Sequence, residues 1–547
     1  MTGAAGGALE PVLAAGDIQG DSLSGFRKDH QHYEFLKVGD IATAKRSLAR
    51  LAPRLSPLAD VHMFNRLFRH MRTRRGEIPG TLSSTWINVA FTSSGLAALT
   101  SQAEVAQFDD EAFKLGLAAR AGKLGDPVDP HAEGHPARWV VGGPQTPVDA
   151  VVIVGSDSAD NLATTVTDVV SLLTGTDGGF TTVWSEPCDV RADLPGHEHF
   201  GFRDGISQPG IRGRLSQDAD SYLTSRYLEP ADPRAARFSR PGQPLVWPGE
   251  FVLGLPRQQV PPADDLEPAP AVPPQPAWAA NGSFLVIRRL RQDVAAFTGF
   301  VEQTAAQLSE QPGLEGLSPQ RLAALIVGRW PSGAPLTRAP DADDPDLGAD
   351  DFAANDFGYV SPWGQSGTSG PPELVTTRPL PHGVAPHDVH PRPVADAGGL
   401  LCPHGAHVRK INPRDQGTDL GGPRNTLRRR ILRRGMPFGP PHATAPDASR
   451  GLMFACYQAS IQDQFEFLST NWVNRFSAPR ADPGGADLLI AESAATARRT
   501  LILVDKSGRQ HEVATLATWV TPTGGGYFFA PAISAVRDVL TAETPPS

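Results

Sequence analysis

Cysteine is scarce in this chain: its 547 residues include only Cys188, Cys402 and Cys456. Three cysteines cannot form a disulfide framework, and the odd number leaves at least one thiol free, which favours a reducing compartment. None of the three belongs to a Cys-x-x-Cys pair, so we expect no structural zinc site built on thiolates.

Long apolar runs are also missing. The sequence has no stretch of about 18 consecutive apolar residues, so we expect no membrane-spanning helix and no membrane partner. Residues 1–16, MTGAAGGALEPVLAAG, lack the basic start and the long apolar centre of a secretory signal. The sequence therefore predicts a soluble protein of the cytoplasm.

Positive charge is in deficit. The 50 Lys and Arg residues face 59 Asp and Glu residues, which gives a formal net charge of −9, whereas nucleic-acid binders are normally basic. Phosphate-binding signatures are absent as well, because there is no GxxxxGK[ST] and no GxGxxG between a strand and a helix. Nucleic acid is thus not an expected partner, and an antiparallel α+β fold is favoured over a doubly wound parallel sheet.

Glycine and proline, by contrast, are abundant, with 55 and 52 residues, and the hydrophobic fraction is 40%. They are scattered without a collagen-like period, which indicates long loops around a compact core. At about 100–200 residues per domain, the length allows at least two domains.

Strand-then-helix units recur along the chain. Runs of β-branched or aromatic residues are followed by apolar residues at helical spacing, as at Leu162, Val166, Val169 and Leu173. The expected strands and the helices that follow them are 85–91 with 93–100, 151–154 with 162–173, 283–290 with 294–301, 452–457 with 461–472, and 525–530 with 531–540. Ser318 followed by Pro319 predicts one more helix, as far as Arg329.

This organisation predicts two similar α+β halves on either side of a Pro-rich segment. The expected parts are a disordered lead at 1–16, an N-terminal half at 17–254, a linker or long loop at 255–280, a C-terminal half at 281–540 and a disordered tail at 541–547.

The first polar cluster is HEHFGFRDGISQP, residues 197–209. Gly201 and Gly205 flank Phe-Arg-Asp, so Asp204 is presented at a tight turn where the backbone can approach a flat ligand. The alternative is a surface loop in which Asp204 pairs with the arginine before it.

The second cluster is CPHGAHVRKINPR, residues 402–414, which contains His404, His407 and Arg414. A neutral imidazole can ligate iron, and neighbouring arginines suit the carboxylates of a haem or of another anion. The alternative is a basic loop with histidines at its edge. A third stretch, 424–439, has six arginines between 424 and 434 and is typical of a solvated face or an anion patch.

Two weaker patterns concern metal ions. His197 and His199 would lie on one face of a strand as a metal pair, but no third ligand is nearby. The acidic stretch 341–351 fits calcium poorly, because it lacks the glycine and the glutamate of a calcium-binding loop.

Three stretches together resemble the signatures of the dye-decolourising (DyP-type) haem peroxidases: HFGFRDGISQPG, CPHGAHVRKINPR and ILRRGMPFG. Supporting matches run along almost the whole chain, among them DIQGDSLSGF, PGEFVLG, NGSFLVIRRLRQDVAAF and GGGYFFAP. The resemblance implies an α+β fold of two ferredoxin-like halves with antiparallel sheets, of the dimeric α+β barrel type. It also implies one haem b per chain, bound in the second half.

The resemblance implies roles for individual residues as well. Asp204 would be the distal acid–base residue and Arg433 the distal arginine, while strand alternation would turn Arg434 away. His407 would be the axial ligand of the haem iron, with His404 as its rival.

Further implied residues surround the cofactor. Arg414 would reach a haem propionate, and Gly205, Ile206 and Ser207 would lie beside the haem. Asp463 and Glu466 are the two candidates for a carboxylate that accepts the other N–H of His407 and makes the iron more electron-rich.

The implied activity is that of a haem peroxidase, which reduces hydrogen peroxide while it oxidises dyes, phenols or other organic donors. The alternative is a non-enzymatic haem carrier, or an iron-releasing (deferrochelatase-like) protein on the same fold, although the joint presence of Asp204 and Arg433 argues against it. Nine Trp and six Tyr residues are candidate electron relays. The stretch 358–400 is longer than usual in the family and is a candidate cover for an access channel.

Overall fold

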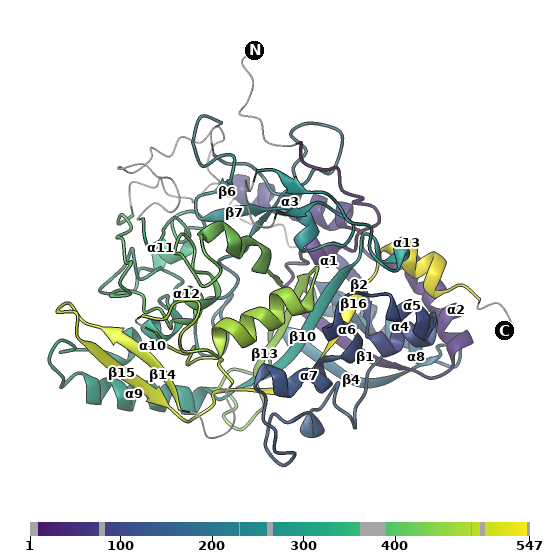
Figure 1. The fold of residues 1–547 in the computed structure, drawn as a ribbon. Helices are drawn as coiled ribbons and strands as arrows, with labels where there is room; N and C mark the ends of the chain where they lie inside the picture. Colours follow the sequence, from purple (N-terminus) through teal and green to yellow (C-terminus); the bar gives the residue numbers. More distant parts are fainter. Residues whose placement is uncertain are drawn as a thin grey trace.

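One large antiparallel sheet forms the centre of the fold (Figure 1). The computed structural model describes residues 9–75, 83–228, 230–259, 266–361, 390–482, 484–492 and 498–543. The sheet has nine strands in the order β11-β13-β10-β16-β2-β3-β1-β4, and β12 also pairs with β13. Their bounds are β1 His30–Val38, β2 Thr85–Phe91, β3 Ala150–Ser156, β4 Phe180–Asp189, β10 Ser283–Gln292, β11 Leu432–Arg433, β12 Met436–Phe438, β13 Gly451–Gln458 and β16 Val520–Ala530.

The strand order divides the sheet into two halves of the same design. In the N-terminal half the order is β4-β1-β3-β2, and in the C-terminal half it is β16-β10-β13 followed by β11 and β12. In each half the first strand thus lies between the third and the fourth, which is the ferredoxin-like arrangement. The two halves share one hydrogen-bonded sheet, because β16 pairs with β2 at Phe529 and Phe91. The expected α+β fold with antiparallel sheets is confirmed.

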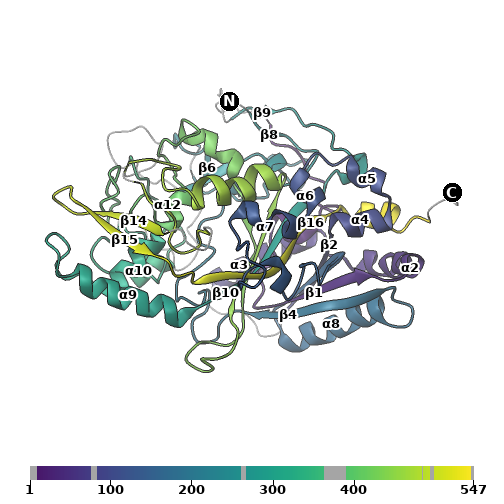
Figure 2. The ribbon, with the colours of Figure 1, turned by 60° about the horizontal axis from the view of Figure 1, so that its bottom comes forward.

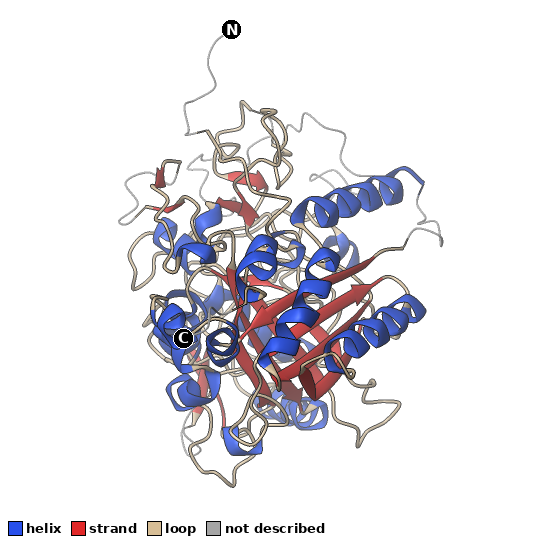
Figure 3. Cartoon of the chain, turned by 90° about the vertical axis from the view of Figure 1, so that its right-hand side faces the viewer, coloured by secondary structure: helices blue, strands red, loops and turns tan. Residues whose placement is uncertain are grey.

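Helices pack against one face of the main sheet, which is called the outer face below (Figure 3). The α-helices are α1 Gly20–Leu23, α2 Ile41–Leu51, α3 Leu58–Arg75, α4 Ser93–Leu99, α5 Gln102–Ala106, α6 Glu111–Leu115, α7 Leu117–Leu124, α8 Ala159–Thr174, α9 Val294–Leu308, α10 Pro319–Val327, α11 Pro345–Ala349, α12 His407–Ile411 and α13 Ile533–Ala535. Three segments are wound as π-helix: Ile461–Glu466, Leu468–Val473 and Val536–Leu540. No helix within the described ranges has the length and apolar character needed to cross a membrane.

The remaining strands form small sheets beside the main one. They are β5 Gly210–Ile211, β6 Phe238–Arg240, β7 Gln243–Val246, β8 Arg257–Gln258, β9 Pro268–Ala269, β14 Arg499–Val504 and β15 Gln510–Thr515. The β14–β15 hairpin lies with α9 and α10 at one end of the molecule, and β4 with α8 lies at the other end (Figures 1 and 2).

The strand and helix positions expected from the sequence are confirmed. Two local signals worked as predicted: Ser158 caps α8 by accepting from the N–H of Asn161, and Ser318 caps α10 by accepting from the N–H of Arg321. The expected helix at 461–472 is present but is wound as π-helix over most of its length.

Both faces of the main sheet are buried. On β3, Val152 and Val154 pack against the helices of the outer face, while Val151 and Ile153 face the opposite core, which includes β1 and β12. This explains why the β3 sequence is a continuous apolar run rather than an alternating one. A third core, between α9, α10 and the β14–β15 hairpin, supports the loops that follow α10.

The structure corrects the expectation for the lead. Residues 9–16 are packed rather than disordered: Leu13 is 4% exposed, and the Glu10 carboxylate forms ion pairs with Arg212 at 3.2 Å and Arg226 at 2.6 Å. The Gly- and Ala-rich composition hid these long-range contacts. Residues 1–8, 544–547 and 362–389, the last of which form most of the long stretch before Cys402, lie outside the described residues.

Candidate functional site

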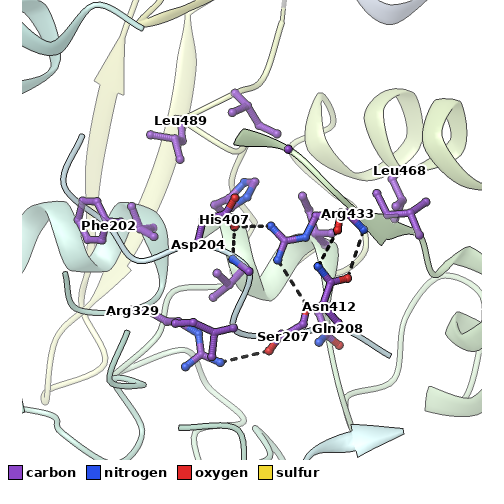
Figure 4. Close-up of a pocket in the computed structure, with 18 of the residues that line it drawn as sticks. Phe202, Asp204, Ser207, Gln208, Arg329, His407, Asn412, Arg433, Leu468 and Leu489 are labelled. Carbon is purple, nitrogen blue, oxygen red and sulfur yellow. Dashed lines mark hydrogen bonds and ion pairs between the residues drawn. The ribbon is translucent and has the colours of Figure 1, made fainter. Parts of the chain in front are cut away.

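A cavity of about 280 Å³ lies beside the C-terminal part of the main sheet and is lined by residues of both halves (Figure 4). Its apolar wall comes from β10, β13 and the helical segment 461–473, with Leu290, Leu452, Phe454 and Leu468 among the lining side chains. Its polar wall comes from the loop 198–209, from α12 and from β11. The three sequence clusters around Asp204, His407 and Arg433 therefore meet at one cavity although they are far apart in the chain.

His407 is the first residue of α12, and its ring lines the cavity. Its Nδ1 lies 2.7 Å from Oδ2 of Asp487, whose side chain is fully buried. The other carboxylate oxygen of Asp487 accepts from the backbone N–H groups of Leu489 and Ile490, which fixes its orientation. A carboxylate held at Nδ1 leaves Nε2 as the ring nitrogen that can ligate a metal.

Asp487 corrects the expectation that Asp463 or Glu466 is the carboxylate partner of His407. Asp463 forms an ion pair with Arg429 at 3.2 Å, and Glu466 binds Arg120 and the Tyr527 hydroxyl. Asp487 lies 80 residues after His407, in an irregular segment, and only the tertiary fold brings the two together. Nothing in the local sequence marks this aspartate.

The rival histidine lies elsewhere. Nε2 of His404 is 3.1 Å from the carbonyl oxygen of Ala397, and His404 is not among the residues that line the cavity. The other weak metal patterns gain no support either, because Nε2 of His199 lies at the carbonyl of Phe438 and Asp344 caps α11. Within the described part of the chain, no three His, Cys, Asp or Glu residues are placed to hold a metal ion.

Asp204 and Arg433 are in direct contact. Nη1 of Arg433 donates to Oδ1 of Asp204 at 2.6 Å, and the N–H of Gly205 donates to the same oxygen at 2.6 Å (Figure 4). Burial acts to raise the pKa of Asp204, but the Arg433 guanidinium, the Gly205 N–H and the charge of His407 outweigh it, so the pKa lies below its usual value. The carboxylate is therefore held in its charged form.

Arg434 turns away from the cavity, as strand alternation predicted. Its guanidinium donates to the backbone carbonyls of Asp21 and Leu23, at 2.8 Å and 3.0 Å. Arg433 belongs to the two-residue strand β11, and neighbouring side chains of a strand point to opposite sides. Arg433 therefore contacts Asp204, and Arg434 does not.

Three arginines also line the cavity: Arg329, which is buried, and Arg414 and Arg430, which are half-buried. None of them forms an ion pair with a carboxylate of the described residues, and Nε of Arg430 has no hydrogen-bond partner there. Burial, and the neighbouring charge of Arg414, lower the pKa of Arg329 to about 9 and that of Arg430 to about 10. Buried cations without counter-ions are costly, so this wall suits a ligand that carries carboxylates.

Arg414, which the sequence predicted to reach a haem propionate, lines the cavity, and so does Arg329, which was not predicted. Arg414 donates to the carbonyls of Asn355 and Phe357 at 3.0 Å and 3.1 Å, and its guanidinium lies 3.7 Å from the centre of the Phe357 ring. Arg329 follows α10 and donates to the hydroxyl of Ser207 at 3.3 Å. An arginine just after a helix is so common that the sequence gives no signal of this role.

The loop between Asp204 and Ser207 borders the cavity with little side-chain bulk. Gly205 has a φ of 76°, which favours glycine, and a Cβ placed there would meet no atom within 4 Å. Ile206 and Ser207 follow it along the cavity wall. A flat ligand can therefore approach this stretch of backbone closely, as the sequence predicted.

The side chain of Glu198 fixes the start of the same loop. Its half-buried carboxylate accepts from the N–H groups of Phe200 and Phe202, both at 2.8 Å, and from the side chain of Gln292 on β10. Burial raises the pKa of Glu198. These bonds tie the loop that carries Asp204 to the main sheet.

Comparisons with known proteins agree with this geometry. The family model of the DyP dimeric alpha+beta barrel domain matches residues 17–191, and the model of the Dyp-type peroxidase C-terminal region matches residues 392–482. The dye-decolorizing peroxidase msp1 of Mycetinis scorodonius is 31% identical over 544 residues, which cover 96% of this chain and 87% of that protein. The multifunctional dye peroxidase DyP2 of an Amycolatopsis species is 27% identical, with 97% of each chain covered.

Solved structures show the same likeness. An ancestral D-type dye decolorizing peroxidase superposes with a TM-score of 0.72 at 29% identity, over 97% of this chain and all of that chain. A dye-decolorizing peroxidase in complex with 2,6-dimethoxyphenol superposes with a TM-score of 0.69, also at 29% identity, with the same coverage. Sequence and fold agree over almost the full length of the chain, which therefore belongs to the dye-decolourising (DyP-type) peroxidase family.

Proposed function

We propose that the cavity binds one haem b, whose iron Nε2 of His407 would hold. The observation that carries this proposal is the set of three cavity-lining features: a histidine fixed at Nδ1 by Asp487, an Asp204–Arg433 pair, and three arginines that form no ion pair with a carboxylate of the described residues. Arg329, Arg414 and Arg430 would hold the two propionates, whose charge would satisfy them. Gly205, Ile206 and Ser207 would lie beside the macrocycle.

Bound haem would supply an iron centre that takes up hydrogen peroxide and stores two oxidising equivalents. Asp204, kept ionised by Arg433, would accept the first proton of the peroxide and return it to the departing oxygen, which leaves as water. Arg433 would stabilise the negative charge that develops on that oxygen as the O–O bond breaks. Asp487 would hold the imidazole of His407 in one orientation and strengthen it as a ligand.

The electrons would come from organic donors. Two electrons and two protons complete the reduction of one hydrogen peroxide to two waters, and dyes or phenols can supply them. The support is a related enzyme whose structure contains 2,6-dimethoxyphenol, together with the relatives named for dye oxidation. Bulky dyes would donate at the surface, through Trp or Tyr residues as relays.

A cytoplasmic location is also part of the proposal. Its support is chemical: Cys188, Cys402 and Cys456 are all unpaired and buried, which suits a reducing compartment. Fractionation of the source cells, with immunodetection of the chain, tests it.

An absorption spectrum of the purified, haem-loaded protein, followed by a peroxide pulse, tests the function. We expect a haem band that shifts with peroxide and recovers when a phenol is added. A haem band that never shifts would favour the non-enzymatic carrier, and the absence of any haem band after reconstitution would contradict the proposed cofactor.

A further inference from the structure

Gln208 lies four residues after Asp204 in the loop that borders the cavity, and it has no role in the proposed reaction with peroxide. Its side-chain amide nevertheless binds the backbone of Arg433 twice (Figure 4). The N–H of Arg433 donates to Oε1 at 3.2 Å, and Nε2 donates to the Arg433 carbonyl at 3.1 Å. The Gln208 side chain thus pairs with both the N–H and the C=O of Arg433.

This contact occurs at an open edge of the main sheet. β11 pairs with β13 on one side only, and it is the last strand in the sheet order. Outward-facing N–H and C=O groups of such a strand need other partners when water is excluded. The carbonyl of Arg433 also accepts from Nη1 of Arg434 at 2.9 Å, whereas Gln208 is the acceptor for the N–H. The Gln208 amide therefore acts as a substitute for a neighbouring strand.

The same loop also holds the other end of Arg433. Its Nη1 donates to Asp204 at 2.6 Å and its Nη2 donates to the Ser207 carbonyl at 3.4 Å. Residues 204–208 thus contact Arg433 at the backbone and at the guanidinium. Because both hydrogen bonds hold only over a narrow range of distance, Gln208 restricts how far the backbone of Arg433 can lie from the loop that carries Asp204.

We propose that Gln208 is a positioning residue, which sets the separation of Asp204 and Arg433 by fixing the backbone of Arg433 against the loop. The inference rests on the proposed peroxide chemistry and adds a residue to it. Small displacements matter here, since a misplacement of about 1 Å can slow a reaction by about 10²-fold.

Two substitutions and a matched control test the proposal. Gln208→Leu removes both hydrogen bonds. Gln208→Glu keeps an acceptor for the N–H, but when ionised it places an oxygen against the Arg433 carbonyl; when protonated it restores the donor. Gln19→Leu is the control, because Gln19 forms the same two bonds, each at 2.8 Å, with the backbone of Val89 on β2, away from the cavity.

In the haem-loaded protein, we expect Gln208→Leu to slow the reaction with hydrogen peroxide by about 10- to 100-fold, while haem is retained. The rate of Gln208→Glu, divided by that of the wild type, should rise as pH falls toward the usual carboxyl range near about 4.3. The same ratio for Gln208→Leu should stay flat. Gln19→Leu should lower the melting temperature but leave the peroxide rate at the wild-type value.

A crystal structure of Gln208→Leu supplies a readout that needs no activity: the Asp204–Arg433 contact should be lost or lengthened. A wild-type peroxide rate in Gln208→Leu, or an intact contact in a slow variant, would overturn the proposal. Loss of haem from both Gln208 variants would assign Gln208 to holding the pocket instead, which also overturns it. If the wild type itself fails to react with peroxide, the proposed function fails, and the crystal structure still decides whether Gln208 sets the contact.

Discussion

His404 and His407 are three residues apart, yet only His407 lines the cavity and has a carboxylate at Nδ1. We expect His407→Ala to lose most of its haem, because the axial imidazole is the main bond between protein and iron. His404→Ala, the matched control, should keep it. The ratio of haem to protein absorbance after reconstitution measures this, and the opposite pattern would reassign the ligand.

Asp204 and Arg433 contact each other beside the cavity, so replacing either one should slow the reaction with peroxide. Asp204→Asn removes the base, and we expect the peroxide reaction to slow by about 10²–10⁴-fold. Arg433→Leu removes the charge that stabilises the departing oxygen, and a loss of at least about 10²-fold is expected. Rapid mixing of each ferric variant with peroxide gives the rate. Unchanged rates in both variants would mean that other groups move the proton.

The lowered pKa of Asp204 predicts how that rate depends on pH. The ionised carboxylate is the active base, so a lower pKa keeps the base available as the solution becomes more acidic. The peroxide step should hold its rate from pH 7 down to about pH 4, the usual range of an aspartate, and decline only below it. A collapse below about pH 6, with the pKa of an imidazole, would instead mean that a histidine and not Asp204 is the base.

At the scale of elements, the short helix α12 is held by a residue one turn after His407. Nζ of Lys410 donates to the carbonyls of Arg475 and Gly485, both at 2.7 Å, and also to that of Ala478. These carbonyls belong to the segment that leads to Asp487. The side chain therefore ties the helix of the histidine to the segment of its carboxylate partner.

Lys410→Met should leave the two buried carbonyls, those of Ala478 and Gly485, without this donor. Each unsatisfied group costs about 1–3 kcal/mol, and relaxation recovers part, so we expect a loss of about 2–4 kcal/mol in the free energy of unfolding. Burial lowers the pKa of Lys410 to about 8, so denaturant unfolding should be measured near pH 6, where the amine is charged. Met at the exposed Lys506 is the control, with an expected change within about 0.5 kcal/mol. Equal losses in both variants would contradict the role of Lys410.

Elements that depend on local signals could be predicted, and contacts between distant elements could not. The caps at Ser158 and Ser318 and the buried run of β3 follow from neighbouring residues. Asp487 and Arg329 join the site only because the fold brings separate loops together. Asp204, His407 and Arg433 could be identified from the sequence, but only because their motifs resemble those of a known family. Periodicity and local signals alone did not identify them.

At the scale of the whole molecule, the two halves meet in more than the shared sheet. Asp126, just after α7, forms a buried ion pair at 2.6 Å with Arg288 on β10. Glu492, in the segment after Asp487, lies close enough for Asp126 and Arg288 to act on its charge. Asp126 belongs to the N-terminal half, Arg288 to the C-terminal part of the sheet, and Glu492 to the segment that carries Asp487. The charges of these three residues thus connect the two halves with the segment that holds His407.

This cluster predicts a dependence of stability on pH. Burial, and then the like charge of Asp126, raise the pKa of Glu492 from its usual 4.5 to about 8. Between these values the folded protein keeps a proton that the unfolded chain releases, so stability falls as pH rises through this window. Glu492→Gln removes the titration. We expect it to raise the melting temperature at about pH 8.5 and to change it little at about pH 5. Glu302→Gln, at an exposed helix position, should have no such pH-dependent effect. A gain for Glu492→Gln of equal size at both pH values would show that the pKa of Glu492 is not raised and that the contact between the halves does not depend on its protonation.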